Sequence, residues 1–126
     1  YFYRMKVDFV VLETGLGGLY DCTNVITCPL VSIITSIGYD HMNLLGDILP
    51  KIAFQKAGIV KPNSSTVIFE QTPDVDEVFA KECSKKENQL HIVREKNVSN
   101  YRYDSDLQYF DYDEMKDIAV NLKGMV

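Results

Sequence analysis

The sequence predicts an α/β protein whose sheet is mostly parallel and flanked by helices, followed by a C-terminal antiparallel β-hairpin or meander. Over residues 7–93, strand-sized apolar runs alternate with helical patterns, which is typical of a parallel sheet. After Glu95 the pattern changes: tyrosines stand among aspartates, and apolar and polar residues then alternate from Ile118 to Lys123. That alternation predicts antiparallel strands.

Short apolar runs rich in β-branched residues mark the strands of the first part. We expect them at residues 7–14, 29–37, 66–70 and 90–93. Residues 15–28 contain glycines and polar side chains and are expected to form a loop. Residues 38–41 are expected to turn at the end of the second strand.

Capping residues place the helices between these strands. For the first helix, Asp47 is the expected N-cap, Pro50 fits the first turn, and the helix should stop near Gly58. The second should begin with Thr72 as N-cap and Pro73 in the first turn. Its apolar stripe would consist of Val75, Val78, Phe79 and Cys83.

Composition excludes several classes of protein. The net charge of −5 argues against a groove that neutralises nucleic-acid phosphates. No apolar run approaches the ~18 residues of a membrane span. Cys22, Cys28 and Cys83 form no CxxC pair, which favours reduced thiols in a cytoplasmic protein. The chain does not start with Met, its first residues show no signal-peptide pattern, and its last residues are apolar with no polar tail, so we expect a fragment of a longer protein.

Two residues that could bind a metal follow the first two predicted strands. Glu13 ends the first and His41 follows the second, and adjacent parallel strands would bring these ends together. Glu13 is either a metal ligand or a carboxylate capping the glycine turn. His41 is either a ligand or a turn histidine exposed to water.

Lys56 interrupts the apolar face of the first predicted helix, where Ile48, Ile52 and Ile59 share its spacing. A lysine there must snorkel to water or find a buried partner. A buried lysine would be open to covalent chemistry or to work at a metal site.

Motifs that would bind nucleotide or calcium by themselves are missing. The glycines of residues 15–18 lack the GxGxxG spacing, and no GxxxxGK[ST] occurs in the sequence. The acidic run 104–117 shows no EF-hand spacing and is expected to form solvated turns.

Three segments in this order nevertheless resemble the folylpolyglutamate synthase/dihydrofolate synthase family, which is related to the Mur ligases. They are LETGLGGLYDCTN at residues 12–24, SIITSIGYDH at residues 32–41, and residues 45–62, which include QKAGIVKP. The resemblance implies an ATP-dependent ligase that joins L-glutamate to folate or dihydropteroate through an acyl phosphate. It implies that Mg²⁺ is bound by Glu13, His41 and Lys56, and that Lys56 is catalytic and carbamylated.

The resemblance also assigns roles within the predicted loop at residues 15–28, which we call the glycine loop. Tyr20, Asp21 and Cys22 would contact the pterin-bearing substrate. The loop itself would be shaped by Gly15, Gly17, Gly18, Thr23 and Asn24. The chain departs from the family pattern at Leu19, where arginine is common, and at Cys22, where alanine or serine is usual.

By this resemblance, residues 1–126 are part of the central ATP-binding domain, without its P-loop and without the glutamate-binding domain that follows. Such a piece should be inactive alone, and the full-length protein is expected to be a monomer. Two alternatives remain: a non-catalytic α/β scaffold, and a Mur-type peptide ligase.

Overall fold

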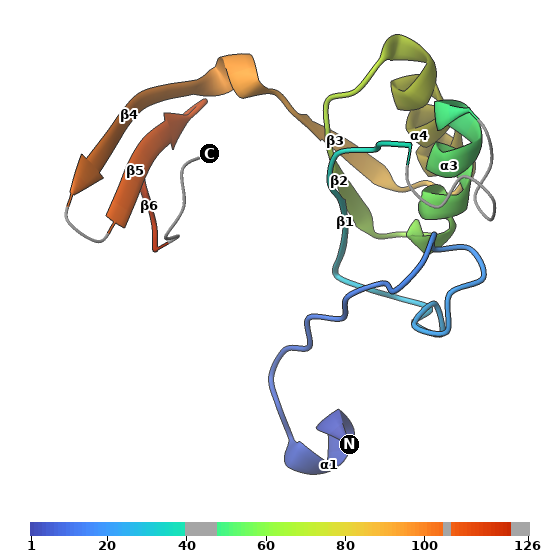
Figure 1. Cartoon of the computed structure of the whole chain (residues 1–126). Helices are drawn as coiled ribbons and strands as arrows, with labels where there is room; N and C mark the ends of the chain where they lie inside the picture. Colours follow the sequence, from blue (N-terminus) through green and yellow to red (C-terminus); the bar gives the residue numbers. More distant parts are fainter. Residues whose placement is uncertain (40–47, 105–106, 122–126) are drawn as a thin grey trace. The chain divides into compact units, whose positions relative to one another are not determined.

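The structure, a computed structural model, describes residues 1–39, 48–104 and 107–121 (Figure 1). The chain divides into two compact units, Tyr1–His91 and Ile92–Val126. Each unit is described by itself below.

A three-stranded sheet forms the centre of the first unit. Its strands are β1 (Val31–Ile34), β2 (Ser65–Phe69) and β3 (Gln89–Val93), in the order β1-β2-β3. β1 and β2 run parallel, with Val31 opposite Ser65. These strands lie within or one residue beyond the predicted runs, so the α/β prediction is confirmed for this part of the chain.

Helices connect the strands and lie on the same side of the sheet (Figure 1). α3 (Leu49–Lys56) continues into the 3-10 turn η1 (Ala57–Ile59), and α4 (Pro73–Lys85) joins β2 to β3. The predicted stop near Gly58 is confirmed.

The helix starts match the capping predictions in part. Thr72 is the N-cap of α4, as expected. The N-cap of α3 is Ile48, which makes no side-chain capping bond, and Pro50 lies in the first turn. The predicted cap Asp47 lies outside the described residues.

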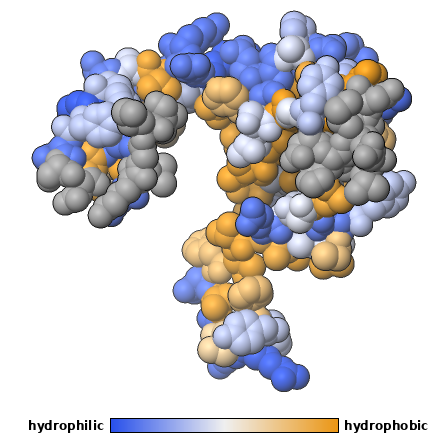
Figure 2. Space-filling view, viewed as in Figure 1, coloured by the Kyte–Doolittle hydropathy of each residue, from blue (hydrophilic) through white to orange (hydrophobic). Residues whose placement is uncertain are grey.

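Within the described residues, α3 and α4 cover one face of the sheet. Alternate residues of β1 and β2 are buried beneath them, as are the inward side chains of α3 and α4. The fully buried side chains include Phe79, Ile52, Ile68, Val60 and Val75. On the other face Val31 and Ile33 are exposed, as is Phe69 at the end of β2. Figure 2 shows hydrophobic residues at the surface of this unit.

The strand predicted at residues 7–14 is wrong. Apart from Thr14, which is half-buried, the segment is exposed and carries no strand in the structure, and Val11 keeps 98% of its side chain accessible. A strand is stabilised by its ladder and by cross-strand contacts, and within the described residues this segment has neither. The only regular element before residue 15 is α1 (Phe2–Met5), a single turn with no buried residue.

The second unit is an antiparallel sheet, as predicted. Its strands β4 (Val98–Asp104), β5 (Leu107–Tyr112) and β6 (Met115–Val120) follow the turn η2 (Glu95–Asn97) and pair in sequence order.

One buried carboxylate joins the three strands of this unit. Asp111 on β5 accepts hydrogen bonds from the Asn100 side chain at 2.6 Å and from the Asp117 backbone at 2.9 Å. The Lys116 ammonium nitrogen lies 3.4 Å from a carboxylate oxygen of Asp111. The Asp117 N–H and the Asn100 amide stabilise the ionised form and hold the pKa of Asp111 below its usual range.

No helix in the described parts of the chain combines the length and the apolar character that crossing a membrane requires.

Candidate active site

The glycine loop is organised around the carboxylate of Asp21. One oxygen accepts from the Leu16 backbone at 2.7 Å, and the other accepts from the backbone and hydroxyl of Thr23 at 2.8 and 2.6 Å. Gly17 adopts φ 68°, a left-handed conformation that glycine accepts at little cost. Asp21 therefore fixes the path of the loop on both sides of its glycines.

These bonds favour the ionised form of Asp21. The Thr23 hydroxyl, the Leu16 N–H and the Thr23 N–H together lower the pKa of Asp21 from 3.8 to about 2. Because the folded-state value lies below the unfolded one, ionised Asp21 stabilises the loop in full above the ordinary pKa. That stabilisation is lost as the pH falls from about 4 towards 2.

Asp21→Asn should loosen the loop. In asparagine an NH₂ group replaces one of the two carboxylate oxygens. This NH₂ cannot accept a hydrogen bond from a backbone N–H, so the bond to Leu16 or the bond to the Thr23 N–H is lost. At neutral pH we expect backbone amides of residues 15–24 to exchange with solvent about tenfold faster than in the unchanged protein. Hydrogen exchange measured by mass spectrometry checks this, with both proteins compared at each pH. The difference should shrink between about pH 4 and pH 2; a difference independent of pH would contradict the linkage.

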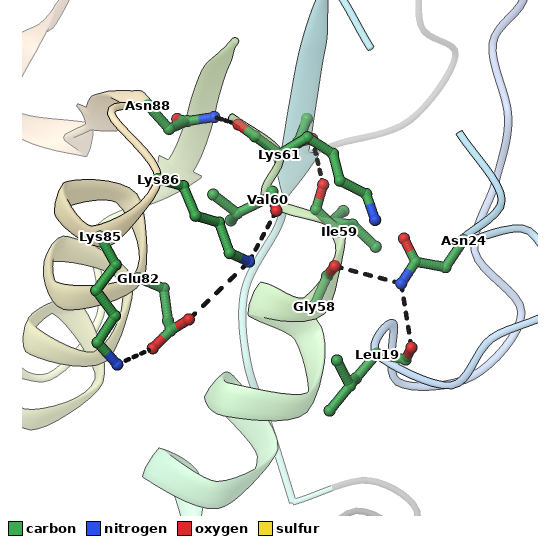
Figure 3. Close-up of polar contacts among 11 residues, drawn as sticks. Leu19, Asn24, Gly58, Ile59, Val60, Lys61, Glu82, Lys85, Lys86 and Asn88 are labelled. Atoms are coloured by element: carbon green, nitrogen blue, oxygen red, sulfur yellow. Dashed lines mark hydrogen bonds and ion pairs between the residues drawn. The ribbon is translucent and has the colours of Figure 1, made fainter. Parts of the chain in front are cut away.

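The loop packs directly on the C-terminal end of α3. The Leu19 N–H donates to the Gln55 carbonyl at 2.8 Å. The side-chain amide of Asn24 donates to the carbonyls of Leu19 at 3.1 Å and Gly58 at 3.3 Å, as Figure 3 shows. The loop and the helix end are therefore joined by backbone and side-chain bonds between residues more than thirty positions apart.

Glycines make this close approach possible. A Cβ on Gly18 would lie 2.9 Å from the carbonyl oxygens of Gln55 and Lys56. A Cβ on Gly58 would lie 2.2 Å from the Leu19 Cα. Each glycine leaves room that the opposite backbone fills.

Lys56 is the last residue of α3 and is half-buried. Its carbonyl faces Gly18, so the structure brings the predicted catalytic lysine and the glycine loop to the same place. A half-buried lysine can reach water with its ammonium group, which is the snorkelling interpretation.

The predicted metal ligands are only partly described. Glu13 is exposed and, because residues 7–14 form no strand, it does not end one. His41 lies outside the described residues. Within residues 1–39, 48–104 and 107–121, no three His, Cys, Asp or Glu side chains gather as a metal site would require. The trio of Glu13, His41 and Lys56 stays a prediction.

The residues predicted to contact substrate differ in exposure. Tyr20 is 87% exposed and Cys22 is exposed, whereas Asp21 is half-buried and bonded within the loop. All three cysteines are free, and Cys83 is buried in the core.

Sequence reasoning missed the role of Gly58. It was expected only to stop a helix, yet the backbone of Leu19 packs directly against it. Gly58 has no left-handed φ, so glycine is needed here for space and not to turn the chain. The sequence alone does not distinguish these two uses of a glycine.

Several known proteins are similar to this chain. The chain is 49% identical over 80 residues to the dihydrofolate synthase/folylpolyglutamate synthase of Bacillus subtilis (strain 168), a match that covers 64% of this chain and 18% of that protein. It is 60% identical over 60 residues to the mitochondrial folylpolyglutamate synthase of Bos taurus, covering 48% of this chain and 10% of that protein. The chain thus spans less than a fifth of these curated relatives.

A solved structure described as an FPGS-AMPPCP-folate complex superposes with a TM-score of 0.83 at 32% identity, covering 96% of this chain and 30% of that one. At this identity the likeness confirms the fold. The sequence profile of the Mur ligase middle domain matches residues 2–125, nearly the whole length. The chain therefore belongs to the Mur ligase middle domain family.

Proposed function

We propose that this chain is part of the ATP-binding middle domain of a folylpolyglutamate synthase or dihydrofolate synthase. The complete enzyme would join L-glutamate to folate or dihydropteroate at the expense of ATP. The observation that carries the proposal is the packing of the glycine loop on the end of α3 beside Lys56, which places two of the three family segments together.

The relatives favour folate over a cell-wall substrate. Both curated proteins named above are folylpolyglutamate synthases, and one solved relative is described with AMPPCP and folate. We therefore assign the substrate-binding role to the exposed loop residues Tyr20 and Cys22. Asp21, whose oxygens are occupied by loop donors, orients those two side chains.

The proposed reaction has two steps. An oxygen of the substrate carboxylate attacks the γ-phosphorus of ATP, ADP leaves, and an acyl phosphate forms. The amine of glutamate then attacks the acyl carbon, releases phosphate and leaves an amide; its extra proton passes to solvent or to a base. The middle domain must hold the carboxylate and the phosphate in line, because most of the rate enhancement in such transfers comes from position and charge.

The chain offers donors that suit Mg²⁺. Glu13 is exposed and brings carboxylate oxygens, and a carbamate on Lys56 would add two more, formed when the neutral amine attacks CO₂ and loses a proton. Oxygen ligands are those that Mg²⁺ prefers. With His41, these residues would hold the ion, whose charge stabilises the transferring phosphoryl group.

The test is ligation by the full-length protein. With ATP, Mg²⁺ and labelled glutamate, we expect ADP to form in step with a labelled amide product. Comparing tetrahydrofolate with dihydropteroate as acceptors distinguishes the two activities. Reading the sequence upstream of Tyr1 for a GxxxxGK[ST] loop tests the ATP site independently.

Glu13→Ala should lower turnover strongly without unfolding the protein. Loss of a metal ligand removes several kcal/mol of charge stabilisation, so we expect kcat to fall at least about a hundredfold. Glu13 is exposed, so the melting temperature should change little. Activity measured against Mg²⁺ concentration, with thermal unfolding as the control, checks this. A melting temperature that drops in proportion to activity would contradict a metal role.

A further inference from the structure

The residues that follow α3 form a fixed platform, which we define as residues 57–61. The Ser32 hydroxyl on β1 donates to the Ile59 carbonyl at 2.9 Å. From the end of α4, the Lys86 ammonium donates to the Val60 carbonyl at 2.9 Å, and the Asn88 amide donates to the Lys61 carbonyl at 2.8 Å (Figure 3). Val60 and Asn88 are buried, and all three bonds are at least partly shielded from water.

Asn24 attaches the glycine loop to this platform. Its side-chain NH₂ has two hydrogens, and both are used: one bond goes to Leu19 within the loop and one to Gly58 on the platform. The side chain is half-buried. The Leu19 N–H, bonded to the Gln55 carbonyl, holds the same stretch of the loop one turn back along the helix.

We infer that Asn24 is a positioning residue, which sets Lys56 and the glycine loop at a fixed separation so that substrate and lysine meet correctly. This inference rests on the proposed function, because it needs a reaction in which Lys56 takes part. Neither of the two bonds that the Asn24 side chain donates goes to Lys56 or to the loop residues assigned to substrate. Its effect passes through Leu19 and Gly58, the two contacts that place the loop against the end of α3.

The chemistry of the side chain makes the inference testable. In Asn24→Asp the amide nitrogen is replaced by an oxygen of the same size, so volume is kept while both donated bonds are lost. A carboxylate oxygen then faces two carbonyl oxygens and is repelled by both. In Asn24→Ala the bonds are lost without the repulsion, which provides a second variant if the first folds poorly.

The experiment is a double-mutant cycle in the full-length ligase. We expect Asn24→Asp to lower kcat about 10- to 100-fold, because a shift of about 1 Å in a positioned group can cost that much. The KM for ATP should stay within about twofold of the unchanged enzyme. In a Lys56→Ala background the same change should cost less than about threefold, since it acts through a residue already removed. Asn63→Asp, the same change at an exposed turn position, is the matched control.

Hydrogen exchange supplies a readout that does not need activity. Asn24→Asp should speed exchange in residues 15–24 while leaving α4 unchanged. Equal losses of kcat in both backgrounds, or unchanged exchange in the loop, would overturn the inference while the ligase function stands. An unchanged enzyme that forms no ADP with folate acceptors would overturn the proposed function and this inference with it.

Discussion

Gly58→Ala is expected to displace the glycine loop and to cost both stability and activity. The new methyl group would lie 2.2 Å from the Leu19 Cα and 2.5 Å from its nitrogen, and backbone atoms cannot rotate away as a side chain can. Overpacking of this kind costs about 1–3 kcal/mol. Displacement of the loop from Lys56 should lower kcat about a hundredfold.

The sign of the stability change separates this mechanism from helix propensity. Alanine in place of a helical glycine normally stabilises by about 0.5–1 kcal/mol, so any loss must come from the contact with Leu19. Thermal unfolding and turnover of the full-length protein measure both effects. Gly38→Ala is the control, because its Cβ would meet no atom of the described residues within 4 Å. A Gly58→Ala protein as stable and active as Gly38→Ala would show that the loop does not rest on this glycine.

Lys56→Ala should remove nearly all turnover and should respond to added carboxylic acid. If Lys56 works as a carbamate, its loss removes a negatively charged oxygen donor from the reacting centre, and we expect kcat to fall about a thousandfold or more. A short acid such as formate or acetate can occupy the vacated space and supply the missing oxygens. We expect the acid to raise kcat of the Lys56→Ala variant at least about tenfold, and the effect to saturate as the acid concentration increases.

Lys51→Ala, at an exposed position on the same helix, is the matched control and should neither lose activity nor respond to acid. Rescue by a short amine in place of an acid would show that Lys56 works as a cation. Equal responses of the two variants to acid would remove the carbamate from the mechanism.

The helices and most strands were predictable because their signals are local. Thr72 and Pro73 mark the start of α4, and the spacing of Val75, Phe79 and Cys83 gives its buried face. The start of the helix and its buried face can therefore be predicted from residues within one or two helical turns of each other. The same holds for the alternation that predicted β6.

The errors and omissions arise where structure depends on distant partners. Residues 7–14 have the composition of a strand, but composition does not report whether a neighbouring strand is present to pair with them. The Asn24 bond to Gly58 joins residues 34 positions apart, and no periodicity records it. Lys56 combines a local and a non-local property. Its place on an apolar helix face could be predicted from residue spacing, whereas its half-buried state depends on packing against residues distant in the sequence.

The face of the β1-β2-β3 sheet opposite α3 and α4 has a practical consequence for anyone who produces residues 1–126. Bare side chains such as Ile33 and Phe69, together with the apolar residues before the glycine loop, would favour self-association and precipitation at the concentrations used for crystals. Solubility should rise when surface charges are introduced on that face.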